Sequence, residues 1–78
     1  MRHFILTFHT HFEALTAFKQ AQKSAEIHTV KLIAVPRKLS SGCGTALSVS
    51  TDRCSVFEQF GYDELFECFE DEKFIKVQ

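Results

Sequence analysis

The sequence lacks the features that would place it in several common classes of small protein. Its 78 residues carry a formal net charge of −1, so no excess of basic residues indicates DNA or RNA binding. Its three cysteines form no Cys-x-x-Cys pair, and their odd number does not suit a disulfide-bonded secreted scaffold. Nucleotide binding has little support, because no Walker lysine arrangement and no Gly-x-Gly-x-x-Gly occurs. We therefore expect no nucleic-acid partner and a reducing compartment.

Long apolar runs are missing as well. The apolar run near the start, ending at Phe8, is too short and too polar at its end for a signal peptide. No later run approaches the roughly 20 apolar residues of a membrane-spanning helix. The sequence also contains no repeat, linker or low-complexity tract. We therefore expect a single domain over residues 1–78, soluble and cytoplasmic, with no membrane contact.

The first residues predict a strand followed by a helix. Apolar and polar residues alternate over His3–Phe8, which is the two-residue period of a strand. The segment Thr10–Glu13 then matches a capping box, in which the threonine hydroxyl accepts a hydrogen bond from the glutamate amide. Apolar residues at helical spacing follow, so we expect a helix over about His11–Ser24.

Two further strands are predicted in the middle of the chain. The first covers Thr29–Val35 and ends before Pro36, which cannot donate a hydrogen bond to a neighbouring strand. The second covers Thr45–Ser50, where apolar residues alternate again. Because the two segments are close in sequence, we expect a hairpin with a long connection over residues 36–44.

The remaining residues predict a second helical region and a final strand. After Thr51 and Asp52, apolar residues recur at helical spacing as far as Phe69, with an interruption at Gly61. Phe74–Val77 is short and rich in residues that favour strands. The order β-α-β-β-α-β predicts an α+β, ferredoxin-like fold, with an antiparallel sheet and its helices on one face. The nine phenylalanines are expected in the core.

Cys43 is the residue best suited to chemistry. It lies between Gly42 and Gly44, directly after Ser40 and Ser41. Glycines leave the sulfur uncovered, and small residues can expose backbone amides to an anion. In the predicted topology the first two strands run parallel, so this loop lies at the same end of the sheet as the start of the first helix. The partial positive charge of a helix N-terminus would favour the thiolate.

Charged and imidazole side chains are expected near Cys43. Arg37 and Lys38, in the same loop, add positive charge. The start of the first helix brings three more candidates: His9, Thr10 and His11. A histidine there could act as an acid, a base or a charge partner of the thiol. The two histidines and the cysteine could also ligate zinc or copper, but no fourth ligand supports this set, and we expect no metal and no other cofactor.

The other two cysteines, Cys54 and Cys68, fall in or beside the predicted second helical region. Packing as small apolar residues explains them adequately. Either could serve as a resolving thiol only if the fold placed it close to Cys43, and the predicted fold separates them.

The segment from Lys31 to Leu47 resembles a known family. Its Val-Pro-Arg, Ser-Ser and Cys-Gly elements occur in this order, after a first strand that ends in Thr-Phe-His-Thr and a helix with two alanines. The sequence is similar to the small bacterial family of selenium/sulfur carrier-like proteins, long described as a domain of unknown function, over most of residues 4–49. The resemblance implies Cys43 and Gly44 as the hallmark pair and the movement of sulfur or selenium as the role.

Three functions follow from these observations. In the first, Cys43 carries a persulfide or selenopersulfide between donor and acceptor proteins, and the chain is a carrier rather than a stand-alone enzyme. The second is a non-catalytic interaction or regulatory module, in which Ile5 and Thr7 on the helix-free sheet face support a homodimer or a partner contact. The third is a metal-binding module through Cys43, His9 and His11.

Overall fold

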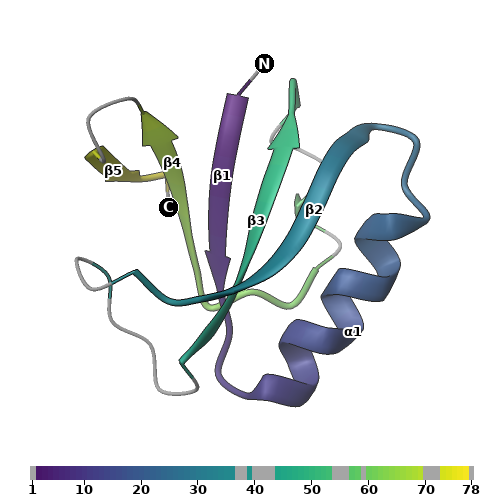
Figure 1. The fold of residues 1–78 in the computed structure, drawn as a ribbon, viewed down its shortest axis with the longest axis horizontal. Coiled ribbons are helices and arrows are strands. Elements are labelled where there is room, and N and C mark those ends of the chain that lie inside the picture. The colour runs from purple at the N-terminus through teal and green to yellow at the C-terminus, as the bar shows by residue number, and fades with distance from the viewer. Residues whose placement is uncertain are drawn as a thin grey trace.

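A five-stranded antiparallel sheet with a helix packed on one face makes up the described part of the chain (Figure 1). The computed structural model describes residues 2–36, 39, 44–53, 57–58, 60–69 and 73–77. In chain order the elements are β1 (Arg2–Thr7), α1 (His11–Gln22), β2 (Ile27–Ala34), β3 (Thr45–Thr51), β4 (Glu64–Phe69) and β5 (Lys73–Lys76). Across the sheet the strand order is β2-β3-β1-β4-β5, and each neighbouring pair is antiparallel.

The Thr10 cap that the sequence predicts at the start of α1 is confirmed. The Thr10 hydroxyl accepts a hydrogen bond from the Glu13 amide and donates one to the Glu13 carboxylate, both at 3.1 Å. The buried face of the helix consists of alanines, which pack against the sheet. Of the described helices, none is long and apolar enough to cross a membrane.

The predicted parallel arrangement of β1 and β2 is also confirmed. Both strands pair antiparallel with β3, so they run in the same direction on either side of it. In the register, Ala46 of β3 lies opposite Thr7 of β1 and Ile33 of β2. The ends of β1 and β2 therefore lie at one end of the sheet, which brings the start of α1 and the residues that flank the β2–β3 connection to the same place.

The prediction of a second helix before Phe69 is wrong. Its second half forms β4, which pairs with β1, and the chain then turns into β5 (Figure 1). A short 3₁₀ turn occurs at 57–58, while 54–56 and 59 lie outside the described residues. The α+β class and the antiparallel sheet hold, but the ferredoxin-like order β-α-β-β-α-β is not confirmed.

The spacing that suggested a helix arises because β4 is apolar on both faces. Leu65 joins the cluster beneath α1, and Phe66 joins a second cluster on the opposite face of the sheet. A strand covered on both sides carries consecutive apolar residues, and these lack the alternation by which a half-exposed strand is recognised.

The larger cluster, between α1 and the sheet, contains four of the nine phenylalanines, and Phe18 packs against it. Phe4 and Phe57 are fully buried there, and their rings meet edge to face with centroids 5.0 Å apart. Such a pair adds about 0.5–1.5 kcal/mol to the stabilisation from burial alone. The prediction that the phenylalanines lie in the core fails for Phe12 and Phe69, which are 66% and 43% exposed.

The smaller cluster covers part of the opposite sheet face. Val35 and Leu39, from the connection after β2, pack against Ile5 and its neighbours. Figure 1 shows the chain beyond β2 crossing over the ends of β1 and β4. Ile5 is only 6% exposed and Thr7 is fully buried, so the predicted partner contact through these two residues has no support. The physical reason is that the connection itself covers this apolar surface.

Candidate functional site

The predicted cysteine site lies partly within the described residues. Six of its members fall outside them: Arg37, Lys38, Ser40, Ser41, Gly42 and Cys43. The members that the structure describes are His9, Thr10, His11 and Gly44. The described residues thus define the base of the loop that contains Cys43 and the helix start beside it.

Hydrogen bonds close the base of this loop. The Val35 amide donates to the Gly44 carbonyl at 3.1 Å, which extends the β2–β3 pairing beyond the ends of the strands. Gly44 has φ +72°, in the left-handed region that glycine adopts without strain. Nearer the start of the loop, the Leu39 amide donates to the Pro36 carbonyl at 2.9 Å. Gly44 therefore directs the chain into β3 one residue after Cys43.

The start of α1 contacts the strand that leaves the loop. Nδ1 of His11 lies 3.0 Å from Oγ1 of Thr45, and Thr45 follows Cys43 by two positions. His11 is the first residue of α1, so this contact joins the helix start to the residues that flank the cysteine. A helix N-terminus presents unpaired amides and a partial positive charge, which together favour a nearby anion.

His9 contacts a different group from His11. Its Nε2 lies 3.2 Å from Oδ1 of Asp63, just before β4, and the Asp63 amide in turn donates to the Thr7 carbonyl at 2.7 Å. No group of three or more His, Cys, Asp or Glu is arranged to hold a metal ion within the described residues. The proposed zinc or copper set therefore has no support there.

Thr10 serves the helix rather than a ligand. Its hydroxyl is engaged by both the amide and the carboxylate of Glu13, so it acts as the cap of α1. The cap stabilises the helix end that His11 brings against Thr45. Thr10 thus stabilises the start of the helix.

Cys68 behaves as the small apolar residue that the sequence predicted, although it lies on β4 instead of a helix. It is a free, half-buried thiol that packs against the smaller cluster. Its sulfur lies 3.9 Å from the Phe69 carbonyl oxygen. Cys54 lies outside the described residues.

Sequence analysis missed Thr45 and Asp63, which contact the two histidines. A threonine at the start of a strand predicts only strand formation, and an aspartate after Gly-Tyr predicts only a turn. Both contacts join residues that are far apart in the chain. Only the strand register and the path of the chain after β3 bring them together.

At the other end of β1 from this site, Arg2 and Glu67 link β1 to β4. Nε and Nη2 of Arg2 donate to the two carboxylate oxygens of Glu67, each at 2.8 Å. The Arg2 guanidinium holds the pKa of Glu67 below its usual 4.5, against a smaller opposing effect of desolvation. The guanidinium also lies 4.9 Å from the centre of the Phe4 ring. The pair therefore stabilises the sheet, away from the cysteine loop.

Comparison with known proteins identifies the family. Residues 3–60 match the family described as "Putative Se/S carrier protein-like". No curated protein and no solved structure matches the chain. The family match begins at the second residue of β1 and continues beyond the end of β3, so it includes the Cys43 loop. The chain belongs to this family of selenium/sulfur carrier-like proteins.

Proposed function

We propose that this member of the selenium/sulfur carrier-like family accepts one sulfur or selenium atom on Cys43 and passes it to another protein. The observation that best supports the proposal is the 3.0 Å contact between His11 and Thr45. It brings the N-terminus of α1 against the strand that follows the Cys43 loop, where its partial positive charge suits a thiolate or a persulfide anion.

The proposed transfer involves no net oxidation or reduction. Cys43 loses its proton to solvent, and the thiolate attacks the terminal sulfur of a persulfide on the donor protein. The sulfur–sulfur bond of the donor breaks as the new bond to Cys43 forms, and the donor cysteine leaves as a thiolate that takes up a proton. A selenopersulfide on the donor would transfer selenium in the same way and leave a sulfur–selenium bond on Cys43.

The residues around Cys43 have proposed roles in this step. The small residues would leave room for a second heavy atom and expose amides to its charge: Ser40, Ser41, Gly42 and Gly44. Arg37 and Lys38 would attract an anionic donor site. The chain would then be a substrate of its donor and acceptor proteins rather than a stand-alone enzyme.

Sulfur loading by a cysteine desulfurase tests the proposal. The chain is incubated with the desulfurase and cysteine, and its intact mass is measured before and after a reductant. We expect the mass of one added sulfur atom, lost on reduction and confined to the Cys43 peptide. Cys43→Ser should abolish the addition, because serine cannot form a persulfide.

Two matched variants serve as controls for loading. Cys54→Ser and Cys68→Ser each remove one thiol and should leave the added mass unchanged. An unmodified chain, in a sample where the desulfurase carries its own persulfide, would contradict the proposal. Equal loading of all three cysteines would contradict it as well.

A further inference from the structure

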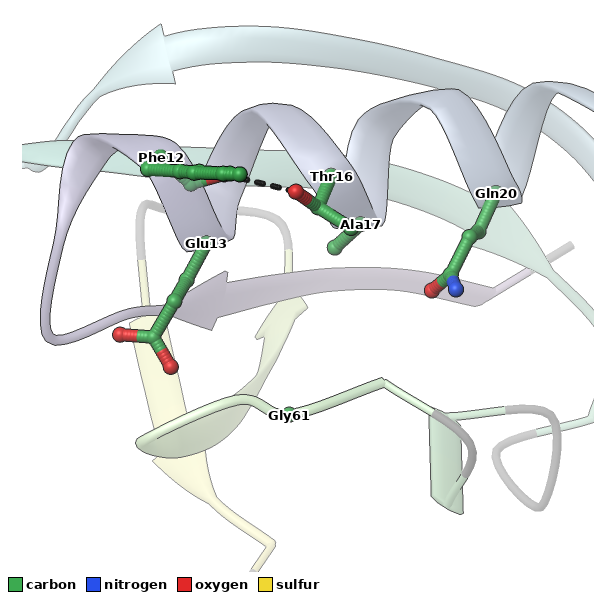
Figure 2. Close-up of a pocket in the computed structure, with 6 residues that line it drawn as sticks. All are labelled: Phe12, Glu13, Thr16, Ala17, Gln20 and Gly61. Atoms are coloured by element: carbon green, nitrogen blue, oxygen red, sulfur yellow. Dashed lines mark hydrogen bonds between the residues drawn. The ribbon is translucent and has the colours of Figure 1, made fainter.

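A groove runs along α1, between the helix and the chain segment that contains Gly61 (Figure 2). It encloses about 340 Å³ and is lined by Phe12, Glu13, Thr16, Ala17, Gln20 and Gly61. None of these described lining residues belongs to the site predicted around Cys43. The groove is therefore a second feature of the molecule, adjoining the first through the N-terminal end of α1.

The groove is open because the residues on either side of Gly61 are anchored in the core. Phe60 is only 4% exposed and Tyr62 packs against the larger cluster, so the backbone between them follows the helix without filling the space. A Cβ atom added at Gly61 would meet no heavy atom within 4 Å. The small Ala17 faces the groove from the helix side.

The lining combines an aromatic ring with a carboxylate. Phe12 is 66% exposed, and Glu13 is the only charged residue among the described residues that line the groove. Figure 2 shows Glu13 and Gln20 extending from the helix towards the Gly61 segment, at the two ends of the groove. Oε1 of Glu13 is 3.1 Å from the Thr10 hydroxyl. Among the described residues no cation pairs with Glu13.

We infer that this groove binds an arginine side chain of a partner protein. A guanidinium pairs with a carboxylate and stacks on an aromatic face, and its aliphatic stem packs on apolar surface. Glu13 supplies the negative charge and Phe12 the ring. The binding itself does not depend on sulfur transfer.

Titration of the ¹⁵N-labelled chain with short peptides tests this inference. The probe is a Gly-Arg-Gly peptide blocked at both ends, and its control carries citrulline, which keeps the shape of arginine without the charge. We expect saturable shifts of the Glu13, Gln20 and Gly61 amides with the arginine peptide. The citrulline peptide cannot form the ion pair with Glu13. Its dissociation constant should therefore be about three- to fivefold higher, which is the effect expected of one solvent-exposed ion pair. No saturable shift at these amides, or equal affinity for both peptides, would overturn the inference.

Two variants of the chain complete the test. Glu13→Gln removes the charge but keeps a side chain that suits the capping box, so it should weaken only the arginine peptide. Gly61→Leu places a side chain in the groove and should abolish the shifts for both peptides while leaving the unfolding midpoint nearly unchanged. Arginine binding that is unchanged in either variant would overturn the inference. Because no sulfur takes part, failure here would be distinct from failure of the loading experiment.

Discussion

Two glycines show how residues of one type differ in what the fold requires of them. Gly44 ends the cysteine loop with φ +72°, whereas Gly61 lies beside an open groove. A Cβ at either position would meet no heavy atom within 4 Å. Only the backbone conformation at Gly44 therefore distinguishes the two.

Replacing Gly44 by alanine should destabilise the chain by about 1–2 kcal/mol, because an L-residue pays this cost in the left-handed region. Urea unfolding monitored by circular dichroism measures the loss. Gly61→Ala is the matched control and should change stability by less than about 0.5 kcal/mol. Equal losses in the two variants would show that the positive φ is not what favours glycine at position 44.

Thr10, the N-cap of α1, is a second residue whose contribution to stability can be measured separately. Thr10→Ala should lower stability by about 0.5–2 kcal/mol, because the Glu13 amide loses its acceptor. Thr10→Ser keeps a hydroxyl and should retain most of the stability. Denaturant titration of the three proteins gives the comparison. A serine variant as unstable as the alanine variant would argue against capping by the hydroxyl.

At this scale, the sequence predicted contacts between near neighbours but not those between distant residues. The hydrogen bond between Thr10 and Glu13 follows from their spacing of three along the chain. The contact of His11 with Thr45 does not follow from any local pattern, since it joins the helix to a strand beyond the loop. The topology placed the two segments at the same end of the sheet, and the structure supplied the contact.

Among the elements, β4 shows where local patterns mislead. From β1 to β3, the predicted ends agree with the structure within two residues. Each of these segments has an alternation, a cap or a proline that identifies it in isolation. The apolar residues of β4 face two different clusters, one on each face of the sheet. The segment is therefore recognisable as a strand only from its pairing with β1 and from the residues that pack on its two faces.

The link between β1 and β4 through Arg2 and Glu67 predicts a dependence of stability on pH. The pKa of Glu67 is lower in the folded chain than its usual 4.5, because Arg2 favours the carboxylate. A depressed folded pKa adds stability above the unfolded pKa, and this stability is lost as the pH falls through the folded pKa. Glu67→Gln should therefore flatten the decline in stability as the pH falls below about 4.5.

Urea midpoints measured across this pH range test the prediction. Arg2→Gln removes the partner and should flatten the decline to a similar extent, and the double variant should add nothing further. Curves for the wild type and Glu67→Gln that run parallel through the acid range would show that the pair does not contribute to acid sensitivity.

For the whole molecule, the two faces of the sheet are unequal. One is covered by α1 and the larger cluster, and the other by residues of the β2–β3 connection. The sequence predicted one helix-free face, and it did not predict that Val35 and Leu39 cover Ile5 there, because connections carry no periodic pattern. The covering connection is the segment that leads to Cys43, so core packing and the candidate site share one stretch of chain.

Phenylalanine substitutions test which of these rings stabilise the core. Phe57→Ala should cost about 3–5 kcal/mol, since this fully buried ring packs on Phe4. Phe57→Leu conserves more of the volume and should cost less than about 1.5 kcal/mol, which keeps the comparison measurable if the alanine variant unfolds. Phe12→Ala is the exposed control and should change stability by less than about 0.5 kcal/mol. A similar loss in Phe12→Ala and Phe57→Ala would contradict the exposure of Phe12.

We expect Cys43 to be the most reactive of the three thiols of the molecule. The most direct measurement is the relative alkylation rate of the three cysteines in the native chain, from mass spectrometry of the labelled peptides after brief exposure to iodoacetamide near neutral pH. Cys43 should label fastest, because the sequence places it between two glycines and the start of α1 contacts the strand that follows its loop. Faster labelling of Cys54 or Cys68, or equal rates at all three, would contradict the claim.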